Sequence, residues 1–152
     1  MRPRNGFTLV ETLIALVVVS LLMLIVFPKV GRALVRHNLR GARTTVVNAA
    51  ALARAAAQEG TRVSWLKFDG TQVLVVARPR MVNLPGSDAD TVGTVRDLAE
   101  AYGVTMAFTA GSDSIRFSPS GLGGLAGNHT VTLSHGSYSE LIQFDGLGRI
   151  QK

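Results

Sequence analysis

The sequence predicts an α+β protein in which one long N-terminal helix packs on a C-terminal antiparallel β head. An apolar run covers Phe7 to Phe27, and after Pro28 apolar residues keep a helical spacing to about Gly60. From Arg62 the period changes to that of short strands separated by turn residues. Trp65, both tyrosines and most of the glycines lie after this change. We therefore expect a helix over residues 7–60 and a globular head over residues 61–152.

Residues 7–27 form an apolar run that matches the thickness of one bilayer. These 21 residues would span roughly 31 Å at about 1.5 Å per residue. Arg2 and Arg4 precede the run, as basic residues do in a secretory signal peptide, but the run is longer than the usual apolar region of about 7–15 residues. A charged helix follows it instead of a small-residue cleavage site. We interpret the run as a retained transmembrane helix.

Two residues stand out in and beside this run. Glu11 is its only charge, and a carboxylate costs about 2.5–3.5 kcal/mol at the bilayer centre unless it is paired. Pro28 follows the run and should kink the helix, because proline has no N–H and its ring clashes with the preceding turn. We expect Glu11 to need a cationic partner.

The helix beyond Pro28 has two faces. Apolar or small residues recur every three or four positions and should pack on the head: Val35, Leu39, Ala42, Val46, Ala49, Ala50, Ala53 and Ala57. Cations recur at a similar spacing on another face: Lys29, Arg32, Arg36, Arg40 and Arg43. The basic face is either solvated or in contact with lipid headgroups, acidic partner subunits or nucleic acid. By the positive-inside rule these cations favour a cytoplasmic head, whereas Arg2 and Arg4 favour a cytoplasmic N-terminus.

The head contains recognisable turn and cap signals. Asp69-Gly70-Thr71 separates two alternating runs, residues 62–68 and 72–77, and predicts a hairpin. Residues 94–103 read as a short helix with Thr94 as its N-cap and Gly103 as its C-cap. Further strands are expected over residues 104–109, 114–118, 129–134 and 138–144, with a terminal stub at 149–152.

The sequence offers little for catalysis or metal binding. It has no cysteine, which excludes thiolate chemistry and disulfides. His37, His129 and His135 lack the spacing of metal ligands. We find no nucleophile–base pair, and we expect no enzyme activity, no cofactor and no metal.

The stretch from Arg4 to Glu11, followed by the apolar run and Pro28, resembles the prepilin leader of type IV pilins and type II secretion pseudopilins. The resemblance implies that residues 1–6 are a leader, which a prepilin peptidase/methyltransferase removes by cutting between Gly6 and Phe7. It implies that Phe7 is then N-methylated and that Glu11 acts in filament assembly, meeting the N-terminal amine of a neighbouring subunit. It also implies a single-pass protein of the bacterial inner membrane with a cytoplasmic N-terminus and a periplasmic head.

The head adds a narrower resemblance, to the GspH/FimT family of minor pseudopilins and minor pilins. The residues that carry it are Ala53-Arg54, Gly60 with Val63, the segment Ile115–Gly121 and Gly148-Arg149-Ile150. It implies a pilin-like fold and a minor pseudopilin of a type II secretion system, a structural subunit of the periplasmic pseudopilus that acts with other pseudopilins and inner-membrane lipid. The alternative is a type IV minor pilin that acts in pilus assembly or in DNA binding and uptake.

The C-terminal tail bears on the DNA-binding alternative. Some members of the family bind DNA through a C-terminal Gly-Arg-x-Arg motif, and here Gln151 stands in place of the second arginine. Arg149 and Lys152 are the residues left for phosphate contact. Two charges give weak, salt-sensitive binding, so we do not expect nucleic acid to be a main partner.

Overall fold

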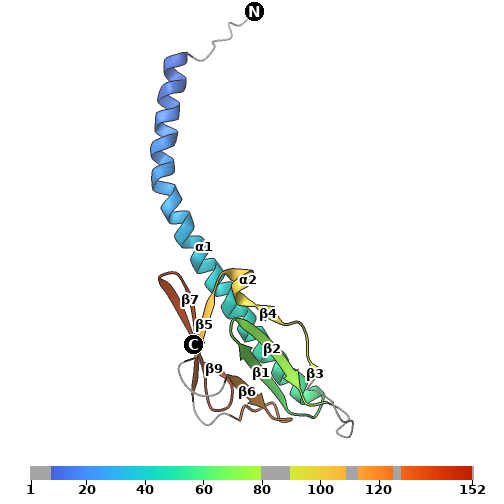
Figure 1. Ribbon diagram of the computed structural model, residues 1–152. Helices are drawn as coiled ribbons and strands as arrows, with labels where there is room; N and C mark the ends of the chain where they lie inside the picture. Colours follow the sequence, from blue (N-terminus) through green and yellow to red (C-terminus); the bar gives the residue numbers. More distant parts are fainter. Residues whose placement is uncertain (1–7, 80–89, 109–112, 125–127, 152) are drawn as a thin grey trace, which may run out of the picture. The chain divides into compact units, whose positions relative to one another are not determined.

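The computed structural model describes residues 8–79, 90–108, 113–124 and 128–151, and these follow the predicted α+β plan (Figure 1). A single long helix, α1 (Leu9–Glu59), precedes the head. The chain divides into two compact units, Met1–Arg36 and His37–Lys152. The second unit contains the C-terminal part of α1 together with the head. The predicted change at residue 60 therefore marks the end of the helix, whereas the compact head unit begins inside it.

In the first unit, α1 starts with a side-chain cap. The Thr8 hydroxyl accepts a hydrogen bond from the backbone N–H of Glu11 at 3.2 Å. Thr8 and Glu11 have the spacing of a capping box, in which a threonine at the N-cap is followed three residues later by a glutamate. The helix is continuous across position 28. The kink at Pro28 stays a prediction, because a proline can bend a helix without ending it.

In the second unit, most of the predicted apolar face of α1 is buried, while Ala49 is half-buried. Leu39, Ala42 and Val46 are at most 4% exposed, and the small residues Ala53 and Ala57 are fully buried. Alanine has the highest helix propensity, and its small side chain lets a sheet approach the helix closely. The Ser64 hydroxyl at the start of the first strand donates a hydrogen bond to the carbonyl oxygen of Ala53. The helix is thereby tied to the head by a polar contact as well as by packing.

Among the described residues, the strands form two antiparallel sheets. In the first, β1 (Ser64–Asp69) and β2 (Gln72–Ala77) form the predicted hairpin, with Gly70 at φ 59° in its turn. β6 (Ser114–Phe117) pairs with the other edge of β1. Two short strands that were not predicted, β3 (Asp90–Thr91) and β4 (Arg96–Asp97), pair with β2. The core-facing residues of this sheet include Leu66, Phe68, Val73, Val75, Ile115 and Phe117.

The predicted N-cap of the short helix was wrong. The helix, α2, covers Leu98–Tyr102, and its N-cap is Asp97 instead of Thr94. Asp97 belongs to β4 and its carboxylate accepts hydrogen bonds from the backbone N–H groups of Ala99 and Glu100 at 2.8 and 3.2 Å. Pairing of β4 with β2 holds residues 96–97 extended, so the helix can begin only after them. The predicted C-cap, Gly103, is confirmed, with a left-handed φ of 65°.

The second sheet has the order β5-β7-β8-β9. Its strands are β5 (Thr105–Phe108), β7 (His129–His135), β8 (Tyr138–Phe144) and β9 (Ile150–Gln151). The predicted strands agree with these within one or two residues at their described ends. Val131, Leu133, Ile142 and Phe144 are buried on one face. Thr130, Thr132 and Gln143 alternate with them, as expected for a sheet with one packed face.

Candidate assembly helix and C-terminal turn

The first unit presents an apolar surface that its own chain does not cover. From Leu9 to Phe27 every large hydrophobic side chain is 46–77% exposed. The most apolar window of α1 has a mean hydropathy of 2.9, and none of it is buried within the protein. Exposed apolar area of this extent is unfavourable in water. It calls for an apolar environment, either a bilayer or the matching helices of other subunits.

Glu11 lies in the first turn of this helix, with exposed apolar residues on both sides. The positive end of the helix dipole favours a carboxylate there. Gly6 and Phe7 lie outside the described residues, so leader cleavage and N-methylation remain predictions. Glu11 is four residues after Phe7 in the sequence, which corresponds to about one helical turn. The pairing of Glu11 with the N-terminal amine of a second chain stays a prediction.

In the second unit, Arg54 contacts two other segments on which the resemblance to the GspH/FimT family rests, Ile115–Gly121 and Gly148-Arg149-Ile150. Its Nη2 donates a hydrogen bond to the carbonyl oxygen of Gly148 at 2.9 Å. Its guanidinium carbon lies 5.5 Å from the centre of the Phe117 ring, within the range of a cation–π interaction. Arg54 Nε is buried without a hydrogen-bond partner among the described residues. A carbonyl and an aromatic face, both from the head, thus hold this cation from α1.

Two glycines allow the chain to close around this contact. Gly148 has a φ of 71°, and a Cβ there would lie 2.9 Å from a carbon of the Phe117 ring. Gly123 donates its N–H to the carbonyl oxygen of Leu147 at 2.8 Å, and a Cβ on Gly123 would lie 2.6 Å from the backbone nitrogen of Gly148. The two backbones approach so closely that a side chain at either glycine would separate them.

Asp145 organises the turn that leads to Arg149. One carboxylate oxygen accepts hydrogen bonds from the backbone N–H groups of Leu147 and Arg149, at 3.0 and 2.7 Å. The backbone N–H of Asp145 donates to the carbonyl oxygen of Arg149 at 2.9 Å. The side chain of Arg149 is exposed, and Lys152 lies outside the described residues. Phosphate contact by these two residues stays a prediction.

From the sequence we predicted a phosphate contact for Arg149, but we predicted no contacts for Arg54 or Asp145. Asp145-Gly146 is a turn signal of the kind that placed the first hairpin, and it could have located the turn. The contact of Arg54 with Gly148 had no local signal, because the two residues are 94 positions apart.

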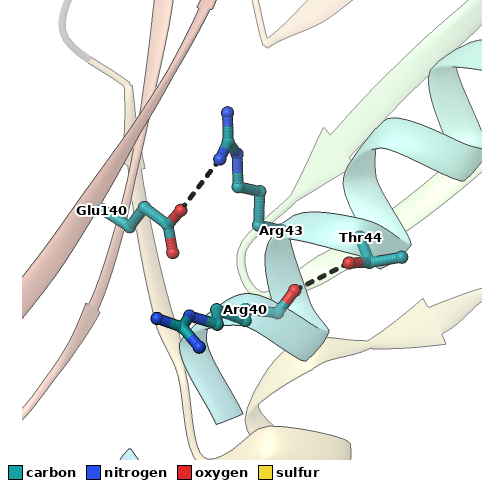
Figure 2. Close-up of polar contacts among 4 residues, drawn as sticks. All are labelled: Arg40, Arg43, Thr44 and Glu140. Carbon is teal, nitrogen blue, oxygen red and sulfur yellow. Dashed lines mark hydrogen bonds and ion pairs between the residues drawn. The ribbon is translucent and has the colours of Figure 1, made fainter. Parts of the chain in front are cut away.

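The basic face of the helix is used differently along its length. Figure 2 shows Arg43 reaching from α1 to Glu140 on β8, with Nη1 3.2 Å from Oε1. The two side chains are 35% and 27% exposed, so the pair is partly shielded from solvent. Arg40, one turn earlier, is exposed, and its carbonyl oxygen accepts a hydrogen bond from the Thr44 hydroxyl at 2.9 Å (Figure 2). Arg43 therefore contributes to the packing of the head, whereas Arg40 faces outward.

The second unit also has a hollow of about 390 Å³ beside α1. Thr45, Leu52, Arg96 and Tyr102 are among the residues that line it, and no histidine, cysteine or carboxylate is in the described lining. Within the described parts of the chain, no three histidine, cysteine or acidic residues are grouped so as to hold a metal ion.

A model of the prokaryotic N-terminal methylation motif matches residues 1–27. The fold is similar to crystal structures of the type IV minor pilin FimU from Pseudomonas aeruginosa strain PAO1. One crystal form gives a TM-score of 0.57 at 18% identity, covering 76% of this chain and 88% of FimU. A second gives 0.54 at 16% identity, covering 74% and 90%. Among curated proteins no sequence matches this chain.

These findings confirm the predicted pilin-like fold and the prepilin motif. The matched residues include the whole exposed apolar run of α1, and the fold is similar to that of a minor pilin. The chain is therefore a membrane-anchored, pilin-like protein with a prepilin N-terminus.

Proposed function

We propose that this protein is a structural subunit, present in few copies, of a filament of the type IV pilin class. It is made as a prepilin and anchored in the inner membrane by residues 7–27, with the N-terminus in the cytoplasm and the head in the periplasm. A prepilin peptidase/methyltransferase cuts after Gly6 and methylates Phe7, and the mature subunit then joins other pilins. The observation that supports this most is a methylation motif on an exposed, membrane-length helix that continues into a minor-pilin fold.

The proposal gives the exposed helix two successive environments. In the bilayer, lipid tails cover the side chains between Leu9 and Phe27, and in the filament the helices of other subunits replace the lipid. Glu11 is unfavourable in the first environment, since a carboxylate in lipid must be neutralised or paired. In the second, the N-terminal amine of a neighbouring subunit can pair with it. Glu11 thus favours the filament over the bilayer.

The likeness to FimU supports a type IV pilus as the filament, and we propose that system first. The resemblance of the head to the GspH/FimT family equally supports a type II secretion pseudopilus, which is the second candidate. Deletion of the gene tests the choice. Loss of surface pili with normal protein secretion is expected for a minor pilin, and the reverse phenotype would assign the protein to a pseudopilus.

Mass spectrometry of the mature protein tests the processing steps. The wild-type chain should lack residues 1–6 and carry one added methyl group on Phe7. Gly6→Val should remain uncut, because a β-branched side chain blocks close access of a protease to the backbone. Gly31→Val is the matched control, since a Cβ at Gly31 meets nothing within 4 Å. A wild-type chain that keeps residues 1–6 would contradict the proposal.

Filament incorporation tests the role of Glu11. Glu11→Gln keeps the size of the side chain and removes the charge, so it should be processed normally yet be incorporated poorly into filaments. Glu59→Gln, at the exposed end of α1, is the control with the same change. Equal incorporation of both variants would contradict the pairing of Glu11 with an amine.

A further inference from the structure

Three cations follow the apolar part of α1 within the first unit. Lys29, Arg32 and Arg36 are exposed. They lie two, five and nine residues beyond Phe27, which is about 3, 8 and 14 Å along a helix. The headgroup layer of a bilayer is about 5–8 Å thick on each side. If the hydrocarbon ends near Phe27, the backbone of Lys29 lies at headgroup depth, Arg32 at its outer limit and Arg36 just outside.

The three side chains share one side of the helix and lean toward the membrane. At about 100° per residue, their positions lie within an arc of about 60°. Cα–Cβ bonds in a helix tilt toward its N-terminus, and long side chains extend in the same direction. Here the N-terminal direction is that of the apolar run. Arg36 is thereby brought back toward the headgroups.

The charge of this segment suits an anionic surface. Residues 28–36 contain these three cations and no acid. Guanidinium groups bind phosphate oxygens through paired hydrogen bonds, and a lysine supplies a compact positive charge. Arg43, which continues the same series of cations, lies in the second unit and pairs with Glu140 of the head. Within the series, Lys29, Arg32 and Arg36 are the members next to the apolar run.

We propose that Lys29, Arg32 and Arg36 form a binding site for the phosphate groups of anionic phospholipids, in the leaflet where the span ends. The inference rests on the membrane anchoring in the proposed function and adds a lipid class to it. The site fixes the depth of the helix in the bilayer. It also opposes departure from the membrane, because these phosphate contacts must be broken when the subunit enters a filament.

The test uses the full chain in phosphatidylcholine bilayers that contain a trace of spin-labelled lipid. Electron paramagnetic resonance measures the association of labelled phosphatidylglycerol relative to labelled phosphatidylcholine. One cation near an anionic surface strengthens association about fivefold. We expect a preference for phosphatidylglycerol of about fivefold or more at low salt, which falls toward unity at about 1 M salt, where the Debye length is about 3 Å.

A charge-matched pair of variants separates the site from net charge. Lys29→Gln/Arg32→Gln/Arg36→Gln should lose the preference. The control is Lys67→Gln/Arg78→Gln/Arg116→Gln, which removes three exposed cations of the head and should keep it. All six positions are exposed, and circular dichroism verifies that both variants keep their helix content.

Three results would overturn the proposal. The wild type could associate equally with both lipids, or the Lys29/Arg32/Arg36 variant could keep the preference for phosphatidylglycerol. The head control could also lose that preference to the same extent as the Lys29/Arg32/Arg36 variant. Poor filament incorporation of the first variant without any lipid preference would assign the cations to an acidic partner subunit instead. The lipid measurement does not depend on processing. A lipid preference in a chain that is never cut after Gly6 would contradict the proposed function and leave the lipid site standing.

Discussion

Arg54→Met tests whether the contact of α1 with the C-terminal turn stabilises the head. Methionine keeps most of the length and apolar volume of the arginine side chain but removes its charge and its donors. The variant loses the hydrogen bond to the carbonyl oxygen of Gly148 and the contact with the ring of Phe117. The variant also removes a buried Nε that has no partner among the described residues. Loss of this unsatisfied donor stabilises the head and so offsets part of the loss.

The magnitude follows from these contacts. A hydrogen bond from a charged donor contributes about 1.5–3 kcal/mol, and a cation–π contact about 0.5–2 kcal/mol. Removing an unsatisfied buried donor stabilises by about 1–3 kcal/mol. We expect Arg54→Met to lower the free energy of unfolding by about 2 kcal/mol, since the Gly148 carbonyl is also left without its donor. For a unit of this size that corresponds to a fall of roughly 8 °C in Tm.

The assay is urea and thermal unfolding of residues 37–152, followed by the fluorescence of Trp65, the only tryptophan. Arg116→Met is the control, because Arg116 is an exposed arginine on β6. It should change the free energy of unfolding by less than about 0.5 kcal/mol. A loss of the same small size for Arg54→Met would refute the stabilising role of the contact.

Three further predictions concern other contacts of the head. Gly41→Val should destabilise it by about 2 kcal/mol in urea unfolding, because even a Cβ at Gly41 would lie 2.7 Å from the ring of Tyr102; unchanged stability would show that α2 can shift freely. A double-mutant cycle of Arg43→Ala and Glu140→Ala should give a coupling free energy of about 0.5–1 kcal/mol, and zero coupling would remove the pair from the account of head packing. The hydrogen bond from the backbone N–H of Glu100, with that from the Thr71 hydroxyl, lowers the pKa of Asp97 below its ordinary value. Because the pKa is lowered in the folded state, ionised Asp97 stabilises the fold at pH values above its unfolded-state pKa near 4, and this stabilisation is lost as the pH falls through the folded-state pKa. The urea midpoint of the wild type should therefore fall more steeply below about pH 4 than that of Asp97→Asn. Parallel curves for the two proteins would contradict this.

Much of the fold could be predicted because it depends on local patterns. The period of the apolar residues gave both the length of α1 and its buried stripe from Leu39 to Ala57. Asp69-Gly70 located the hairpin, because few residue types adopt the positive φ that its turn requires. The predicted cap at Thr94 was wrong for a tertiary reason. Pairing of β4 with β2, and a hydrogen bond from the Thr71 hydroxyl to Asp97 at 3.0 Å, start the helix later than local propensity suggested.

Three features could be located from the sequence alone: the membrane-length helix, the spacing between Gly6, Phe7 and Glu11, and the row of cations beyond Pro28. Each depends only on the spacing of residues along one segment. Only the tertiary structure shows which contacts Arg54 and Arg43 make within the head unit. Arg54 meets Gly148 and Arg43 meets Glu140 across 94 and 97 positions of the chain. No local pattern encodes such pairs, since a guanidinium finds its acceptor only after helix and sheet have packed. The same packing leaves Arg54 half-buried at the C-terminal turn and Arg149 exposed.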